Sequence, residues 1–334
     1  MNRLSKWLPL VFLILAVVYP FTISDSYTLT LLAMSFIWTI AVYGMNLIAG
    51  YTGQLSLAQA GFFGIGAYTY GVLTLKLGVN TIVALLAAIV LTGCIGFLVG
   101  LISLRTKGHY FTIFTLCVGV ILSLILEKWE SVTEGVRGLI GIPGLSVGSF
   151  TFDSYVSQYY LILFCLVLSV FVSKRILHSL FGRTLQSVRN SEDLAEALGV
   201  NVMRTKILSF ALSTMYAGLA GGLYSIMIRF IGPDISVIDH TFDMLLYLIV
   251  GGIGTFWGPL VGTLLVTILT QWMQFLAEYR MVIFGPLLVI LVMFLPHGIM
   301  GSIAKRQMQR NLRKMEQATI AAGDSKRVGR QLDA

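Results

Sequence analysis

The chain has 334 residues, of which 57% are hydrophobic and only 11% are charged, and its mean hydropathy is +0.86. Soluble domains are about 25% charged, and a chain this apolar could not bury its apolar surface in water, so the composition excludes a soluble globular protein. Uninterrupted apolar runs such as residues 82–91 exclude a transmembrane β-barrel, whose strands alternate apolar and polar residues. We therefore predict an all-α polytopic membrane protein.

The net charge of +8 is distributed unevenly along the chain. When the basic ends and connections are assigned to the cytoplasm, 18 of the 23 Lys and Arg residues fall on the inner side, together with six of the 15 acidic residues. This asymmetry orients membrane proteins. It predicts a multi-pass protein with both termini in the cytoplasm, and it accounts for the positive charge without a nucleic-acid partner.

We predict a single transmembrane domain, residues 1–304, followed by a basic cytoplasmic tail, residues 305–334. The length and position of the apolar runs predict ten membrane crossings, at residues 8–18, 29–49, 46–71, 81–104, 111–126, 156–172, 207–228, 242–250, 260–277 and 281–295. The number falls to eight if residues 46–71 and the glycine-rich break at 251–259 are re-entrant. Breaks of this kind are tolerated in a membrane only where protein or a cavity surrounds their backbone.

The 46–71 segment is unusual for a crossing because it is both polar and rich in small residues. Polar side chains in lipid need partners, so we predict that four of them face protein or a substrate pathway, with helix packing as the alternative: Asn46, Gln54, Ser56 and Gln59. Small residues recur at helical spacing from Ser56 onward, which predicts one face for close helix packing, formed by Ser56, Ala60, Gly64, Ala67 and Gly71.

Residues 182–206 form the one long charged stretch between two apolar blocks. Ser191 is predicted to cap a short helix, with Glu192 and Asp193 in its first turn and Gly199 at its end. A helix this polar cannot lie in hydrocarbon, so we expect it at the cytoplasmic surface, facing water or a partner protein. An ordinary solvated loop is the alternative.

The longest outer segment is predicted at residues 127–155. Its glycines and Pro143, within residues 135–144, predict a folded loop or a re-entrant piece rather than a strand.

The sequence lacks the usual signatures of catalysis and of self-powered transport. It contains no GxxxxGK[ST] phosphate loop, and its charges lie at the ends of apolar segments rather than within them. Cys94, Cys117 and Cys165 are too far apart for a metal or disulfide pattern, so no catalytic group, metal or cofactor is predicted. A membrane-embedded enzyme is disfavoured, and energy for transport has to come from another protein.

The segment DLAEALG, residues 193–199, resembles a relaxed form of the EAA-type loop of ATP-binding-cassette importer permeases, with Leu194 in place of the usual alanine. Over most of its length, the chain resembles the M-type subunit of the branched-chain amino-acid (high-affinity leucine/isoleucine/valine) permease family. The resemblance is carried by residues 46–68, 135–144, 189–206, 251–262 and 296–301.

This resemblance implies a non-catalytic permease subunit of the bacterial inner membrane. The implied partners are a second, different permease subunit, two ATP-binding subunits, a periplasmic substrate-binding protein and membrane lipid. Branched-chain amino acids are the implied substrate; urea, short amides or other amino acids are alternatives, and a self-sufficient secondary carrier is an alternative of another class. The residues implied to couple to the ATPase are Arg189, Glu192, Asp193, Ala195, Glu196, Leu198 and Gly199.

Overall fold

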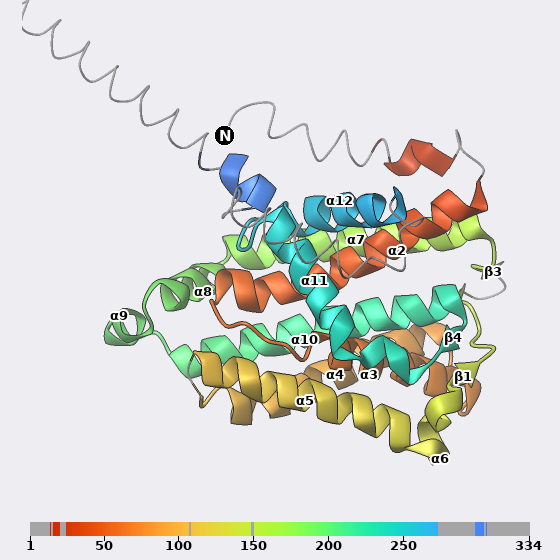
Figure 1. The fold of residues 1–334 in the computed structure, drawn as a ribbon, viewed down its shortest axis with the longest axis horizontal. Helices are drawn as coiled ribbons and strands as arrows, with labels where there is room; N and C mark the ends of the chain where they lie inside the picture. Colours follow the sequence, from red (N-terminus) through yellow and green to blue (C-terminus); the bar gives the residue numbers. More distant parts are fainter. Residues whose placement is uncertain are drawn as a thin grey trace, which may run out of the picture.

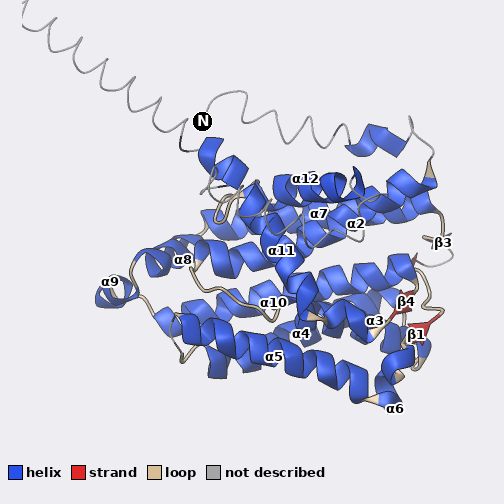
Figure 2. Cartoon of the chain, viewed as in Figure 1, coloured by secondary structure: helices blue, strands red, loops and turns tan. Residues whose placement is uncertain are grey.

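The computed structural model describes residues 14, 16–20, 25–106, 108–147, 150–272, 298–303 and 305. The predicted crossing at 281–295 lies outside the described residues, as do most of the crossing at 8–18 and nearly all of the 305–334 tail. Helices dominate the described chain and run roughly along the long axis of the molecule (Figures 1 and 2). The prediction of an all-α polytopic protein is confirmed.

Five helices within the described ranges are long and apolar enough to cross a membrane. They are α2 (Ser26–Met45) with its continuation to Tyr51, α4 (Thr81–Ser103), α5 (His109–Lys128), α7 (Tyr155–His178) and α10 (Val202–Ile228). Three shorter helices lie among them: α3 (Gln59–Leu75), α11 (Ile238–Gly251) and α12 (Gly258–Trp272). The number of crossings, ten or eight, stays a prediction.

Two of the long helices are central and three are peripheral. In α2 and α10, 78% and 67% of the apolar window is buried, whereas α4, α5 and α7 bury between 22% and 33%. α10 packs against α2, α3 and α4. The outward faces of the peripheral helices carry large apolar side chains such as Leu98, Ile113 and Phe164, each about 60% exposed. Lipid or a neighbouring subunit can cover such a surface.

Glycines let α10 lie directly against α3 and α4. A Cβ at Gly66 of α3 would come within 2.5 Å of the Gly218 Cα in α10, and a Cβ at Gly218 would overlap the side chain of Thr92 in α4. Backbone therefore contacts backbone between α3 and α10, the close approach that small residues permit in membranes. Gly66 was not part of the packing face predicted for the 46–71 segment.

Residues 46–71 do not form one continuous helix, and whether the segment crosses the membrane or is re-entrant stays a prediction. α2 continues through a π-helical turn, η1 (Asn46–Tyr51), residues 52–58 are not helical, and α3 begins at Gln59. Gly53 takes a left-handed backbone conformation, φ +79°, which ends the helix at little cost for a glycine. We call residues 46–58 the first break.

Ser56 lies in the first break and not on α3, so the predicted five-residue face is wrong at this position. The other four members, Ala60, Gly64, Ala67 and Gly71, lie on α3 but meet different neighbours. Gly64 lies against Ser236, Gly71 against Leu139 and Ile231, and Ala67 against α10. Helical spacing alone cannot show where the helix begins.

The break at residues 251–259 is confirmed, because α11 ends at Gly251 and α12 begins at Gly258. We call residues 252–257 the second break. The connecting segments at one end of the molecule are α8 (Leu180–Asn190) and α9 (Glu192–Ala197); Figure 1 shows them at the opposite end from β1 and β4.

That opposite end is closed by short elements. They are α6 (Glu130–Thr133), η2 (Gly135–Arg137), β1 (Leu139–Ile140), β2 (Ser146–Val147), β3 (Phe150–Thr151), β4 (Phe230–Ile231) and η3 (Pro233–Ser236). β1 pairs antiparallel with β4, Leu139 opposite Ile231, and β2 pairs with β3. The expectation of a loop without a strand is therefore wrong at residues 139–140, because their strand partner lies about ninety positions away and left no local signal.

Candidate functional site

The charged stretch at residues 182–206 folds largely as its sequence predicts. The Ser191 hydroxyl accepts a hydrogen bond from the Leu194 N–H at 3.3 Å and so caps α9. Glu192 and Asp193 occupy the first turn, where the helix dipole favours acidic residues. Gly199, with φ +84°, follows the helix and turns the chain toward α10. The prediction of a capped helix at this position is confirmed.

The residues of α9 divide into an outward and an inward set. Leu194 and Leu198 are 62% and 75% exposed, and Asp193 and Glu196 are exposed beside them. Ala195 is buried, because α9 packs on α8 and α10 at this point. Two leucines and two acidic residues are thus accessible to solvent or to a partner protein, whereas the Ala195 side chain packs inside the protein.

Glu192 is less exposed than its acidic neighbours and makes contacts inside the protein. Its Oε1 atom lies 2.5 Å from Lys206 Nζ and accepts a hydrogen bond of 3.0 Å from the Gln54 side-chain amide. Lys206, one turn into α10, is 3% exposed, and Gln54, in the first break, is 6% exposed. One carboxylate oxygen therefore joins α9, α10 and the first break.

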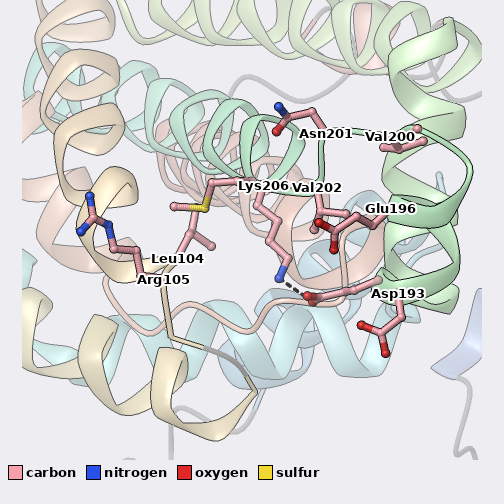
Figure 3. A pocket seen from close by; sticks show the side chains of 11 residues that line it. Leu104, Arg105, Asp193, Glu196, Val200, Asn201, Val202 and Lys206 are labelled. Atoms are coloured by element: carbon pink, nitrogen blue, oxygen red, sulfur yellow. Dashed lines mark ion pairs between the residues drawn. The ribbon is translucent and has the colours of Figure 1, made fainter.

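A groove of about 620 Å³ opens beside this ion pair. It is lined by the end of α4, by α9 and by the start of α10. Figure 3 shows Arg105 across the groove from Asp193 and Glu196, with the ion pair of Lys206 between them. The groove lies between α9 and the turn after α4 (Figure 3).

Side chains from surrounding helices supply hydrogen bonds to the backbone of the first break. The Arg189 guanidinium donates to the Gly50 carbonyl. In α5, the Thr112 hydroxyl donates to the Leu55 carbonyl at 3.0 Å, and Thr115 Oγ1 accepts from the Leu57 N–H at 3.1 Å. Non-helical backbone inside a membrane domain needs such partners, because no water replaces the lost helical hydrogen bonds.

Asn46 connects the two breaks. Its side-chain amide donates to the Thr255 carbonyl at 2.9 Å, and its carbonyl oxygen accepts from the Gly254 N–H at 2.9 Å. Asn46 is 2% exposed. A single side chain thus satisfies one donor and one acceptor of the second break from the first residue of the π-helical turn.

The remaining polar residues of this region are also bonded within the protein. Gln59 donates to the Ala41 carbonyl at 3.1 Å and accepts from the Ser213 hydroxyl at 3.2 Å. Ser56 Oγ accepts from the Ala58 N–H at 3.4 Å. In this conformation Asn46, Gln54, Ser56 and Gln59 are buried, and their side chains are hydrogen-bonded within the protein. Their role in a substrate pathway stays a prediction.

Two residues important to this geometry were missing from the predicted site. Lys206 was predicted only as one of several basic residues of the charged stretch, although its position in the first apolar turns of α10 indicates a buried residue. Thr115, which bonds Leu57, left no signal in an apolar helix.

Comparisons with known proteins agree with this architecture. The family model described as branched-chain amino acid transport system / permease component matches residues 27–292. The high-affinity branched-chain amino acid transport system permease protein LivM of Escherichia coli is 28% identical over 311 residues, covering 86% of this chain and 73% of its own. A probable branched-chain amino acid transport permease protein LivM of Methanocaldococcus jannaschii is 26% identical over 267 residues, covering 71% and 77%.

A third relative has a different name within the same kind of system. The high-affinity branched-chain amino acid transport system permease protein LivH of Escherichia coli is 23% identical over 284 residues, covering 79% of this chain and 91% of its own. No solved structure matches this chain.

Apolar helices of membrane-spanning length around two joined breaks, with a charged helix at one end, define a multi-pass membrane permease. The chain belongs to the family of branched-chain amino acid transport system permease components, and it is a multi-pass protein of the inner membrane.

Proposed function

We propose that this chain is the membrane-spanning subunit of an ATP-binding-cassette importer for branched-chain amino acids. The family match and the printed names of the relatives support this substrate. The chain itself is not an enzyme in this proposal. ATP is hydrolysed on two separate subunits, since the sequence contains no phosphate loop of the GxxxxGK[ST] type.

A second, different permease subunit completes the transport pathway. LivM and LivH of Escherichia coli are two proteins named as permeases of high-affinity branched-chain amino acid transport, and this chain is similar to both. The ATPase subunits bind at the end that carries α8 and α9, and a periplasmic substrate-binding protein binds at the end that carries β1 and β4. Both termini lie in the cytoplasm in this proposal, and the distribution of Lys and Arg supports this orientation.

The outward face of α9 is the observation that carries this proposal. A capped helix holds Leu194 and Leu198 more than 60% exposed, with Asp193 and Glu196 beside them, at one end of a membrane domain. Exposed leucines on a polar helix bind a partner by burying apolar area, and the acids give the contact an orientation. ATP-driven closure of the two ATPase subunits then moves α9 and shifts the permease between two packings.

The double substitution Leu194→Asp with Leu198→Asp tests the docking surface. Both side chains are exposed, so the variant is expected to reach the membrane in normal amount. Co-purification of the ATPase subunits and cellular leucine uptake are expected to fall at least tenfold. The control is Leu77→Asp, a 66% exposed leucine at the opposite end, which leaves ATPase co-purification unchanged. Normal uptake by the double variant would contradict the proposal.

The orientation is tested with single cysteines in a chain whose Cys94, Cys117 and Cys165 are replaced by alanine. In intact cells a membrane-impermeant maleimide is expected to label Val136→Cys, which is at the outer end and 76% exposed in the native chain. Glu196→Cys is expected to react only after the membrane is opened. The reverse pattern would contradict the orientation.

The substrate and the energy source are tested with the whole transport system in proteoliposomes. Leucine uptake is expected to require ATP and to be inhibited by isoleucine and valine but not by urea. Uptake by this chain alone, without ATPase subunits, would instead identify a self-sufficient carrier.

A further inference from the structure

The inner side of α9 faces Lys206 of α10, the one charged residue in the described part of the protein that is less than a tenth exposed. Lys206 is 3% exposed, and its Nζ meets Glu192 Oε1 at 2.5 Å. A buried ammonium group is unfavourable unless a carboxylate compensates it. Lys206 therefore requires Glu192 at this position, and Glu192 is the first residue of the helix proposed to contact the ATPase.

The same carboxylate oxygen also holds the first break. Gln54 donates to Glu192 Oε1 at 3.0 Å, and Gln54 follows directly on Gly53, where the backbone turns with φ +79°. Displacing α9 therefore either moves residue 54 or breaks a part-buried, charge-assisted hydrogen bond, which is stronger than a neutral one.

A second attachment lies one turn earlier, at the end of α8. The Arg189 guanidinium donates to the Gly50 carbonyl, and it lies so close to Gly254 that a Cβ at residue 254 would overlap it. The charged stretch thus reaches the first break at residues 50 and 54 and touches the second break at residue 254. Asn46 joins the two breaks through Gly254 and Thr255.

We propose that the Glu192–Lys206 ion pair, with Gln54 on the same oxygen, transmits the displacement of α9 to the first break and, through Asn46, to the second. These are positioning residues, and the inference rests on the proposed function. It goes beyond docking, because it assigns the inner side of α9 to moving the interrupted helices while the outer side binds the ATPase. The groove beside the pair leaves α9 room to move toward the turn after α4.

A purely structural role for the pair has a different consequence. If Glu192 and Lys206 only fasten α9 to the bundle, their loss weakens ATPase docking and uptake in the same proportion. If they transmit motion, docking and ATP hydrolysis persist while the amount of leucine carried per ATP falls. The ratio of leucine imported to ATP hydrolysed separates the two.

The experiment uses the complete transport system in proteoliposomes, with the substrate-binding protein and leucine supplied on its outer side. Glu192→Gln and Lys206→Met are expected to retain bound ATPase subunits and at least half of the ATP hydrolysis. The ratio of leucine to ATP is expected to fall at least tenfold. The exchange variant, Glu192→Lys with Lys206→Glu, is expected to recover the ratio to within about threefold of the native value.

The matched control is Arg204→Met, an exposed basic residue two positions before Lys206 on the same helix, which is expected to leave the ratio within twofold. A native ratio in Lys206→Met would overturn the inference, as would a parallel loss of docking and uptake. If Lys206→Met fails to reach the membrane, the same ratio is measured for Gln54→Met, which removes the hydrogen bond to Glu192 without leaving an unpaired charge. A lowered ratio with normal docking supports the inference, and a native ratio overturns it.

Failure of the inference and failure of the proposed function give different results. If the native system shows no ATP-dependent leucine uptake, the proposed function fails. If the native system transports normally and the Glu192 and Lys206 variants keep its ratio, only the transmission role fails.

Discussion

Replacing Asn46 by alanine removes both hydrogen bonds that join the two breaks. Asn46 is 2% exposed, and its bonds to the Gly254 N–H and the Thr255 carbonyl are each 2.9 Å long. A buried donor or acceptor left without a partner costs about 1–3 kcal/mol. With two groups orphaned, the free energy of unfolding is expected to fall by about 2–6 kcal/mol.

The assay is a reversible titration with a denaturing detergent, starting from the purified protein in a mild one. Trp257, at the end of the second break, gives a fluorescence signal close to the site of the change. Asn80→Ala serves as control: Asn80 is an exposed cap of α4 that bonds the Ile82 N–H at 2.9 Å. Loss of a helix cap lowers stability by about 1 kcal/mol.

An Asn46→Ala variant no less stable than Asn80→Ala would refute this reasoning. If leucine uptake were altered while the free energy of unfolding stayed native, the result would instead support the predicted role of Asn46 in the substrate pathway. Asn46→Asp offers a further check, because it keeps the acceptor for Gly254, loses the donor to Thr255 and adds a buried charge. It is expected to be at least as unstable as the alanine variant.

Two further substitutions are expected to lower stability in the same titration. Gly66→Ala forces a Cβ against the Gly218 backbone and is expected to cost about 1–3 kcal/mol, whereas Gly100→Ala approaches one side-chain atom, Cδ1 of the Phe210 ring, no closer than 3.2 Å and is expected to cost less; equal effects would contradict the packing argument. Thr115→Val leaves the buried Leu57 N–H without its acceptor and is expected to cost about 1–3 kcal/mol, so a native stability would show that water reaches this part of the first break.

The features that the sequence predicted correctly are those with a local cause. Ser191, the acids after it and Gly199 are all within nine residues of one another, and each acts on the helix that contains it. The break at 251–259 was visible for the same reason, because glycines and a proline interrupt an apolar run. Membrane class followed from composition, which needs no knowledge of contacts.

The features that were missed depend on partners far away in the chain. Ser56 continued the spacing of small residues but lies before α3. The backbone of residues 52–58 is not helical, and part of it is hydrogen-bonded to side chains of α5, such as Thr112, which lie far away in the sequence. Strand β1 exists because β4 lies beside it. The partners of Lys206 were not visible in the sequence, because Glu192, which pairs with its ammonium group, is 14 positions away, and Gln54, which donates to the same carboxylate oxygen, is about 150 positions away.

The glycine contacts of α10 restrict which parts of the permease can slide past one another. Two helices that touch through side chains can adjust by exchanging rotamers, but the backbones of α3 and α10 meet at Gly66 and Gly218 with no side chain between them. Thr92 of α4 fills the remaining space on the other side of Gly218. These three helices therefore have to travel as one rigid body during a transport cycle, and the shear takes place at its boundaries with the other helices.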